Sequence, residues 1–298
     1  MHAYHTQPEY LPLLQAEFSQ FELLDSGTLL SSERIFPLFA VDVWHDCEIL
    51  PFQSIKEAAQ LLQARGRLWF HYGHAAFRRG SLIGEHLRLL KNKPLTFGTL
   101  PPLTPFGIYT LLNEHTLLLC PAPQKPIPLG EMAFIENKTI PPNRAYLKLW
   151  EFFTLLREFP KKGELCMDVG ASPGGWSWVL AECGATVIAI DKAVLAPNIS
   201  QHPQIHFQQG SAFALDPRDF DPIDWFCSDI ICYPARLVDL IEKWLASGKV
   251  KRMVCTIKLQ GETDWGSIHH LQAIPNATVQ HLWNNKHELC FYYKKQAT

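Results

Sequence analysis

Apolar positions in the second half of the chain alternate between two spacings. Short apolar runs that favour β-strands are separated by segments whose apolar residues recur at helical spacing. Strands that alternate with helices predict an α/β domain, with a doubly wound, mostly parallel sheet and helices on both faces. The expected strands are residues 164–169, 185–190, 205–208, 224–227 and 250–257, the expected helices run from the first strand through residue 183 and over 237–245, and segments 279–283 and 288–293 are expected to close the sheet as a hairpin.

The first half of the chain predicts a smaller α+β domain. Residues 54–64 begin with Ser54, a residue type that caps helices, and carry apolar side chains at helical spacing. The other expected elements are a strand at 67–72, an amphipathic helix at 82–90, and a hairpin of 106–112 with 115–120 around Asn113-Glu114.

Prolines lie between these two halves, at positions 121, 123, 126, 128, 141 and 142. Each proline fixes φ and removes a backbone donor, so this stretch is expected to be extended and poor in regular structure. We therefore predict a boundary near residue 138. It divides the chain into an N-terminal α+β domain at 1–138 and an α/β domain at 139–298.

The composition is that of a globular protein, with 47% hydrophobic and 19% charged residues. Lys and Arg total 27 against 29 Asp and Glu, and this formal net charge of −2 excludes a uniformly basic protein that coats nucleic acid. Any nucleic-acid surface is therefore expected to be a local patch. The N-terminal residues lack the pattern of a signal peptide, and no apolar run approaches the ~20 residues of a membrane helix. We expect a cytoplasmic protein without membrane contact.

Cysteine and histidine spacing predicts no metal site. The eight cysteines include no C-x-x-C pair, and several fall in apolar, strand-like runs, as Cys227 does. Buried reduced thiols are expected rather than a disulfide framework or a metal site. The histidines, among them His5, His269 and His270, lack metal-ligand spacing with a cysteine or carboxylate.

A glycine-rich turn follows the first strand of the α/β domain and precedes a helix. Its small residues allow a sharp turn that a ligand can approach closely, and the helix offers unpaired N–H groups. Asp191 ends the next strand, ~20 residues after Gly170. A carboxylate there can accept hydrogen bonds from both hydroxyls of an adenosine ribose. The pattern favours a nucleotide-type ligand, and the alternative is a tight turn that needs glycine only for its backbone. The expected binding residues are Gly170, Ala171, Ser172, Pro173, Gly174, Gly175, Trp176 and Asp191.

The run D-V-G-A-S-P-G-G-W at 168–176 resembles the motif with which FtsJ-type ribose 2′-O-methyltransferases bind S-adenosylmethionine. The resemblance covers roughly residues 139–298 and implies a Rossmann-like methyltransferase sheet, this cofactor and an RNA substrate. Other motifs of the family stand in the same order: P-N-R-A-Y-L-K-L at 142–149, C-S-D-I at 227–230, T-I-K-L at 256–259 and H-E-L at 287–289.

The resemblance implies that the Lys-Asp-Lys-Glu tetrad of the family falls on Lys148, Asp229, Lys258 and Glu288, with Asp229 also beside the cofactor. Within the family, the segments around residues 234–236 and Lys258 are most similar to the RlmM branch, which methylates a ribose of large-subunit ribosomal RNA. Ribosomal RNA is therefore the implied partner. Enzymes of that branch carry an N-terminal THUMP-containing region, whose pattern residues 1–138 do not show.

These four residue types suit the deprotonation of a ribose hydroxyl. A 2′-hydroxyl is a weak nucleophile until it gives up its proton, and a buried lysine beside a second cation has a lowered pKa. We expect Lys148 to depress the pKa of Lys258, which leaves Lys258 as general base. Asp229 is expected to hold Lys258 near the cofactor, and Glu288 to position Lys148 and the ribose. Seen singly, Asp229 is more typical of a loop cap, Lys258 of a lysine that extends to solvent, and Lys148 and Glu288 of surface charges.

Two further features qualify the prediction. Residues 208–211 lack the acidic residue that the family usually places against the adenine amine. A basic stretch interleaved with aromatic residues suits phosphate contact and base stacking, although a solvated helix face has the same composition. The stretch comprises Arg78, Arg79, Arg88, Lys91 and Lys93 beside His71, Tyr72 and Phe77.

Two rival functions stay open at this stage. One is a methyltransferase that acts on a small molecule or a protein, with the tetrad fortuitous. The other is a non-catalytic RNA-binding protein that retains the fold.

Overall fold

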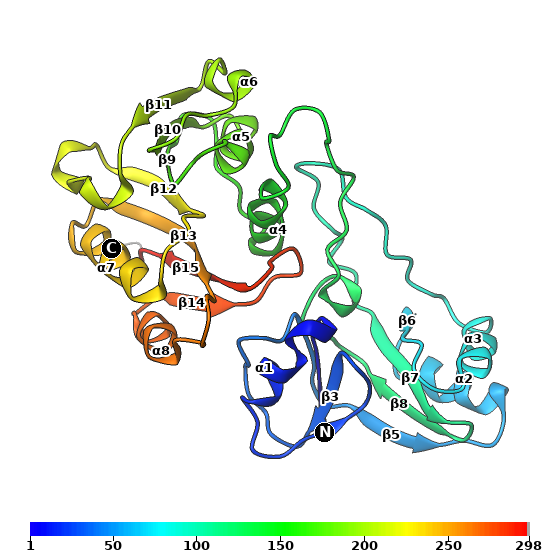
Figure 1. Ribbon diagram of the computed structural model, residues 1–298. Coiled ribbons are helices and arrows are strands. Elements are labelled where there is room, and N and C mark those ends of the chain that lie inside the picture. Colours follow the sequence, from blue (N-terminus) through cyan, green and yellow to red (C-terminus); the bar gives the residue numbers. More distant parts are fainter. Residues whose placement is uncertain (297–298) are drawn as a thin grey trace. The chain divides into compact units, whose positions relative to one another are not determined.

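The computed structural model describes residues 1–296, and the chain divides into two compact units (Figure 1). The N-terminal unit comprises residues 1–95 and 100–133, and the C-terminal unit comprises residues 96–99 and the chain from Phe134 onward. The short segment 96–99 belongs to the second unit because Phe97 packs its ring against Trp150 and Trp178, at centroid distances of 5.2 and 5.3 Å. The division lies close to residue 138.

A seven-stranded sheet with the order β11-β10-β9-β12-β13-β15-β14 forms the centre of the C-terminal unit. The first five strands in this order run parallel, β15 pairs antiparallel with β13, and β14 pairs antiparallel with β15 at the edge of the sheet. This sheet confirms the predicted doubly wound α/β fold and its closing hairpin. The strands are β9 (Leu165–Val169), β10 (Thr186–Asp191), β11 (Ile205–Gln209), β12 (Ile223–Ser228), β13 (Val250–Lys258), β14 (Ala277–Gln280) and β15 (Glu288–Lys294).

Helices cover both faces of this sheet (Figure 1). Successive residues of a strand point to opposite faces, and β12 shows the consequence. Trp225 packs its ring against Phe153 of α4 on one face, whereas Phe226 packs against Trp244 of α7 on the other. The helices are α4 (Tyr146–Leu156), α5 (Gly175–Glu182), α6 (Pro197–Ser200), α7 (Pro234–Ala246) and α8 (Trp265–Ala273), with short 3-10 turns at Ala212–Ala214 and Pro217–Asp219.

The N-terminal unit contains two four-stranded sheets, β2-β3-β1-β4 and β5-β8-β7-β6. The predicted helix after Ser54 is confirmed as α2, because the Ser54 hydroxyl accepts from the N–H of Glu57 at 3.2 Å. The hairpin around Asn113-Glu114 is confirmed as β7 and β8. The elements are β1 (His2–His5), η1 (Pro8–Tyr10), α1 (Leu11–Gln15), β2 (Glu22–Leu23), β3 (Thr28–Ser31), β4 (Asp42–Trp44), β5 (Glu48–Pro51), α2 (Ile55–Gln63), β6 (Trp69–His71), α3 (Phe77–Gly84), β7 (Gly107–Asn113), β8 (Thr116–Cys120) and η2 (Pro128–Gly130).

The predicted helix at 82–90 is wrong in its position. Helix α3 ends at Gly84, and residues 88–90 instead run extended beside β6. The N–H of Trp69 donates to the carbonyl of Arg88 at 3.0 Å, and the N–H of Leu90 donates to the carbonyl of Trp69 at 2.8 Å. Pairing with a neighbouring strand thus overrides the helical spacing of the local sequence.

Glycine is required in the turn after β9. Gly174 has a φ of +113°, and a Cβ atom there would lie 2.6 Å from Cγ2 of Ile199. Gly170 has a φ of +76°, and a Cβ atom would lie 2.8 Å from Cβ of Ile230. The backbone therefore follows a path that residues with a side chain rarely adopt.

All eight cysteines carry free thiols, and seven of them are buried, as the apolar surroundings predict. Within the described chain, none of the helices combines the length and the apolar character that crossing a bilayer requires.

Candidate active site

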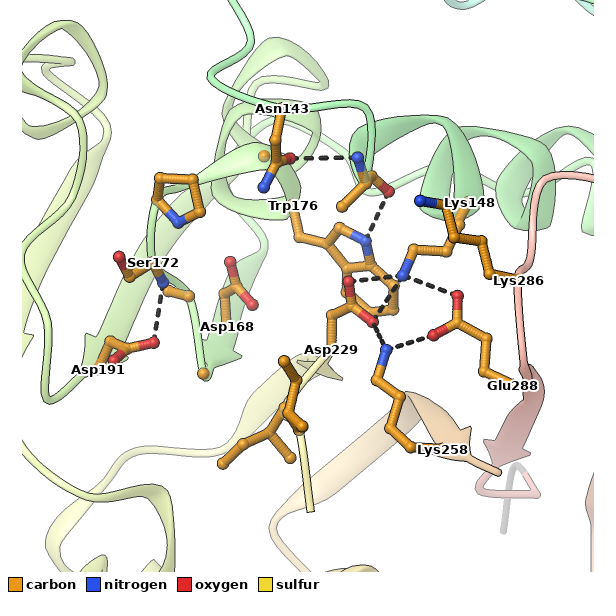
Figure 2. A pocket seen from close by; sticks show the side chains of 17 residues that line it. Asn143, Lys148, Asp168, Ser172, Trp176, Asp191, Asp229, Lys258, Lys286 and Glu288 are labelled. Carbon is orange, nitrogen blue, oxygen red and sulfur yellow. Dashed lines mark hydrogen bonds and ion pairs between the residues drawn. The ribbon is translucent and has the colours of Figure 1, made fainter. Parts of the chain in front are cut away.

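A cavity of about 570 Å³ lies at the carboxyl ends of the parallel strands of the C-terminal unit. Doubly wound sheets bind their ligands at this edge. The glycine turn forms one side of the cavity, and Lys148, Asp229, Lys258 and Glu288 form the other (Figure 2). The structure thus brings both predicted sets to one cavity, although they are spread over more than a hundred positions of sequence. The exception is Gly174, which is not among the lining residues and instead lies against Ile199.

Strand register explains how the four charged residues meet. Lys258 is the last residue of β13 and stands opposite Glu288, the first residue of the antiparallel strand β15. Asp229 follows directly on β12, the parallel neighbour of β13. Lys148 comes from the first turn of α4.

The four side chains form a closed ring of alternating charge (Figure 2). Nζ of Lys148 lies 2.7 and 2.8 Å from the two carboxylate oxygens of Asp229 and 2.8 Å from Oε1 of Glu288. Nζ of Lys258 lies 2.5 Å from Oδ1 of Asp229 and also contacts Oε2 of Glu288. The side chains are between 5% and 16% exposed, so solvent screens these interactions weakly.

The ring fixes the ionisation of Asp229 and Lys258. Burial raises the pKa of Asp229, but the ammonium groups of Lys258 and Lys148 outweigh burial and hold that pKa below its usual value. Burial lowers the pKa of Lys258, but the charges of Asp229 and Glu288 and the hydrogen bonds to them outweigh it and raise that pKa. The predicted depression of the pKa of Lys258 by Lys148 is therefore wrong for this arrangement, because both carboxylates lie against the two cations.

Asp191 connects the glycine turn to the end of β10. Its Oδ2 accepts from the N–H of Ser172 and its Oδ1 from the N–H of Ala193, both at 2.9 Å. Each carboxylate oxygen can accept a second hydrogen bond, so two acceptor positions stay available at the cavity. Trp176 lies deeper: its indole N–H donates to the carbonyl of Ala145 at 2.9 Å and ties α5 to the start of α4.

A second, smaller cavity of about 230 Å³ continues from Gly170 and Asp191 toward the end of β11. The predicted absence of an acidic residue at 208–211 leaves Gln209 as a substitute, but its side-chain amide donates to the carbonyl of Lys192 at 2.9 Å. The lining instead includes Phe213 with the guanidinium of Arg236 3.8 Å above its ring. Sequence patterns do not predict this pair, since the two residues lie on separate elements.

Asp168, the first residue of the glycine motif, was not among the predicted binding residues. It lines the cavity although it is only 1% exposed, and burial raises the pKa of its carboxyl group to about 7. The Ser177 hydroxyl donates to its Oδ2 at 2.6 Å, whereas its Oδ1 has no hydrogen-bond partner among the described residues. An acidic residue inside an apolar strand was the available signal.

A further acidic residue, Glu151, joins two elements of the site. It lies one turn after Lys148 on α4 and is 1% exposed. Its carboxylate accepts from the backbone N–H groups of Trp283 and Asn284 and from the Asn284 side chain, each at 2.7 Å. Glu151 therefore holds the segment that leads into β15, and with it Glu288, against the helix that carries Lys148.

Comparison with known proteins agrees with this geometry. Residues 141–259 match the family model described as FtsJ-like methyltransferase. The predicted resemblance is confirmed. The match covers the turn, Lys148, Asp229 and Lys258, and it ends before Glu288.

Two curated relatives are both named ribosomal RNA large subunit methyltransferase M. The one from Halorhodospira halophila is 32% identical, over 53% of this chain and 48% of its own length. The one from Teredinibacter turnerae is 31% identical, over 59% of this chain and 51% of its own length. This chain therefore spans about half the length of the curated relatives it matches. A solved structure from Plasmodium falciparum, named as a ribosomal RNA methyltransferase, is 19% identical over 51% of this chain and 96% of that chain, and its TM-score of 0.39 carries no functional argument.

Proposed function

We propose that this protein is an S-adenosylmethionine-dependent RNA ribose 2′-O-methyltransferase that acts on large-subunit ribosomal RNA. The observation that carries the proposal is the ring of Lys148, Asp229, Lys258 and Glu288 beside the glycine-turn cavity. The FtsJ-like match and the names of the relatives support the reaction class and the substrate. A ribosomal RNA substrate also favours a cytoplasmic localisation.

The residues around the cavity fit the cofactor. The buried Oδ1 of Asp168 lacks a partner and would accept from the ammonium group of the methionine part. The turn at 170–176 offers small residues, and Asp191 retains acceptor positions for the ribose hydroxyls. Asp229 would lie beside the cationic sulfur. When bound, S-adenosylmethionine supplies an electrophilic methyl group.

The four residues of the ring would bind, orient and deprotonate the ribose hydroxyl. As the ring stands, Lys258 holds its proton because two carboxylates contact its Nζ. A 2′-hydroxyl that hydrogen-bonds to Nζ would displace one carboxylate, and the loss of that partner would lower the pKa of Lys258. Lys258 would then release its own proton to solvent, and the neutral amine would accept the hydroxyl proton as general base, while Lys148 and Glu288 keep the oxygen in place.

Substitution of Lys258 tests the reaction. We expect Lys258→Ala to reduce methyl transfer about 10²–10⁴-fold, the usual contribution of a general base. Lys258→Arg should reduce methyl transfer by a similar factor, since a guanidinium does not give up its proton. The measurement is transfer of tritium from labelled S-adenosylmethionine to total RNA, with calorimetry of S-adenosylhomocysteine to show that cofactor binding persists.

The matched control is Lys251→Ala on the same strand, because Lys251 forms an exposed ion pair with Asp224 away from the cavity. Full methyl transfer by the Lys258 variants would contradict the assigned role. Label in protein or small molecules but not in RNA would favour the rival methyltransferase, and no binding of S-adenosylhomocysteine would favour the non-catalytic RNA-binding protein. Maps of ribose methylation in RNA from cells with and without the gene would identify the nucleotide.

A further inference from the structure

The basic stretch predicted to contact RNA separates into two parts with different surroundings. In the first part, Arg79 lies 3.8 Å from the carboxylate of Glu114 and 5.3 Å over the ring of Phe52. His71 stacks its ring on Tyr109 at a centroid distance of 4.9 Å. These groups are already engaged within the fold of the N-terminal unit.

The second part borders a cavity of about 440 Å³ in the N-terminal unit. Arg88, Lys91 and Lys93 are exposed members of its lining, and the lining includes no carboxylate. Within residues 1–296 the side chains of these three cations make no hydrogen bond or ion pair. The floor is apolar, with Leu68 and Phe106 at most 9% exposed. The site therefore combines unpaired positive charge with a hydrophobic hollow.

The walls of this cavity are held in place before any ligand arrives. Residues 88–90 are tied to β6 by two backbone hydrogen bonds, from the N–H groups of Trp69 and Leu90. The side chain of Asn92 donates to the carbonyl of Glu131 at 3.0 Å. Four prolines with fixed φ complete the lining, at positions 101, 102, 126 and 128. A preformed cavity costs little ordering entropy on binding.

We propose that this cavity binds an unpaired nucleotide of the RNA substrate, with the base in the apolar hollow and the flanking phosphates on Arg88, Lys91 and Lys93. Single-stranded RNA is recognised by splayed bases held in apolar or aromatic sites, while cations bind the backbone. The volume lies within the range of about 300–1,000 Å³ typical of sites for small organic groups. An acidic peptide would suit the cations, but its carboxylates offer no planar apolar group to the floor. The inference rests on the proposed RNA substrate.

Charge substitutions test the phosphate contacts. We expect Lys91→Gln with Lys93→Gln to weaken binding of a fluorescein-labelled single-stranded RNA about tenfold, measured by anisotropy with the full chain. The slope of log affinity against log salt should fall by about 1.4, since each single-strand phosphate contact contributes about 0.7. The control, Lys56→Gln with Arg78→Gln, removes the same charge from exposed residues outside the cavity and should bind as the wild type does. Equal losses in both variants, or none in the first, would overturn the inference.

Photocrosslinking tests the base contact in the wild-type protein. Single-stranded RNA that contains 5-bromouridine should crosslink to peptides within 88–106 or 126–128, and neither duplex RNA nor poly-glutamate should compete equally well. Crosslinks only elsewhere, or equal competition, would overturn the inference. Methyl transfer is measured separately. Methyl transfer to RNA without these crosslinks would contradict this nucleotide site alone. Crosslinks at this site without methyl transfer would contradict the proposed reaction and support the site.

Discussion

Asp168 carries its carboxyl group among apolar side chains at the end of β9, where the charged form is poorly solvated. Its pKa rises from 3.8 to about 7, chiefly because of burial, although the Ser177 hydroxyl opposes the shift. Between pH 4 and 7 the folded protein therefore holds a proton that the unfolded chain has released. More protons bound in the folded state mean that the free energy of unfolding falls as pH rises through this window.

Asp168→Asn should remove this fall. The amide stays neutral at every pH. The free energy of unfolding of the variant, relative to that of the wild type, should therefore rise by about 2 kcal/mol between pH 5 and pH 8. Urea unfolding of the two proteins at both pH values measures the difference.

Asp224→Asn is the matched control for this measurement. Burial raises the pKa of Asp224, but Lys251 and the N–H of Leu165 outweigh burial and hold the pKa below its usual value. Its carboxylate is therefore ionised in both states throughout pH 5–8, and the effect of the variant should not change across that range. A constant difference between Asp168→Asn and the wild type would show that Asp168 ionises freely.

At the scale of elements, helix α4 organises the site from two positions. Lys148 and Glu151, three residues apart, lie on neighbouring positions of one helix surface. Lys148 contacts Asp229 after β12 and Glu288 of β15, while Glu151 holds the chain that leads into β15. The helix therefore determines where β15 begins relative to the parallel strands.

Glu151→Gln should disturb this arrangement without removing a member of the ring. The glutamine amide presents a donor to backbone N–H groups that need an acceptor, which should cost about 1–3 kcal/mol of unfolding free energy. Because Glu288 loses its support, kcat of methyl transfer should fall more than the affinity for S-adenosylhomocysteine, and kinetics with calorimetry would separate the two. The control is Glu182→Gln, an exposed residue of α5. Equal losses of kcat and affinity would assign Glu151 a purely structural role.

At the scale of the whole molecule, each unit buries hydrophobic clusters of its own. One cluster of the C-terminal unit joins α4 and α5 to the parallel sheet, and other clusters lie within the N-terminal unit. Separate cores of this kind predict two thermal transitions.

S-adenosylhomocysteine should raise the midpoint temperature of only the transition that belongs to the C-terminal unit. At a hundredfold excess over its dissociation constant, a ligand adds about 2.7 kcal/mol, which corresponds to about 5–10 °C for a unit of this size. Differential scanning calorimetry of the full chain measures both transitions. The outcome that contradicts this expectation is an equal shift of both transitions, or a single transition that moves as one.

Local patterns in the sequence determined the seven strands of the C-terminal unit, the glycine turn and the positions of the charged residues in the chain. Strand and helix periodicity, Ser54 as a cap and the spacing from Gly170 to Asp191 depend on neighbours along the chain, so one sequence suffices to predict them. The tetrad was found through family motifs that keep their order.

Contacts between distant segments decided the rest. Residues 88–90 follow an extended path because Trp69 pairs with them, which local spacing does not encode. The pKa of Lys258 rises rather than falls because Asp229 and Glu288 meet its ammonium in space. The hydrogen bond from the N–H of Trp283 to Glu151 likewise joins residues more than a hundred positions apart. Electrostatic energy and strand pairing depend on distances through space, and only the tertiary structure sets those distances.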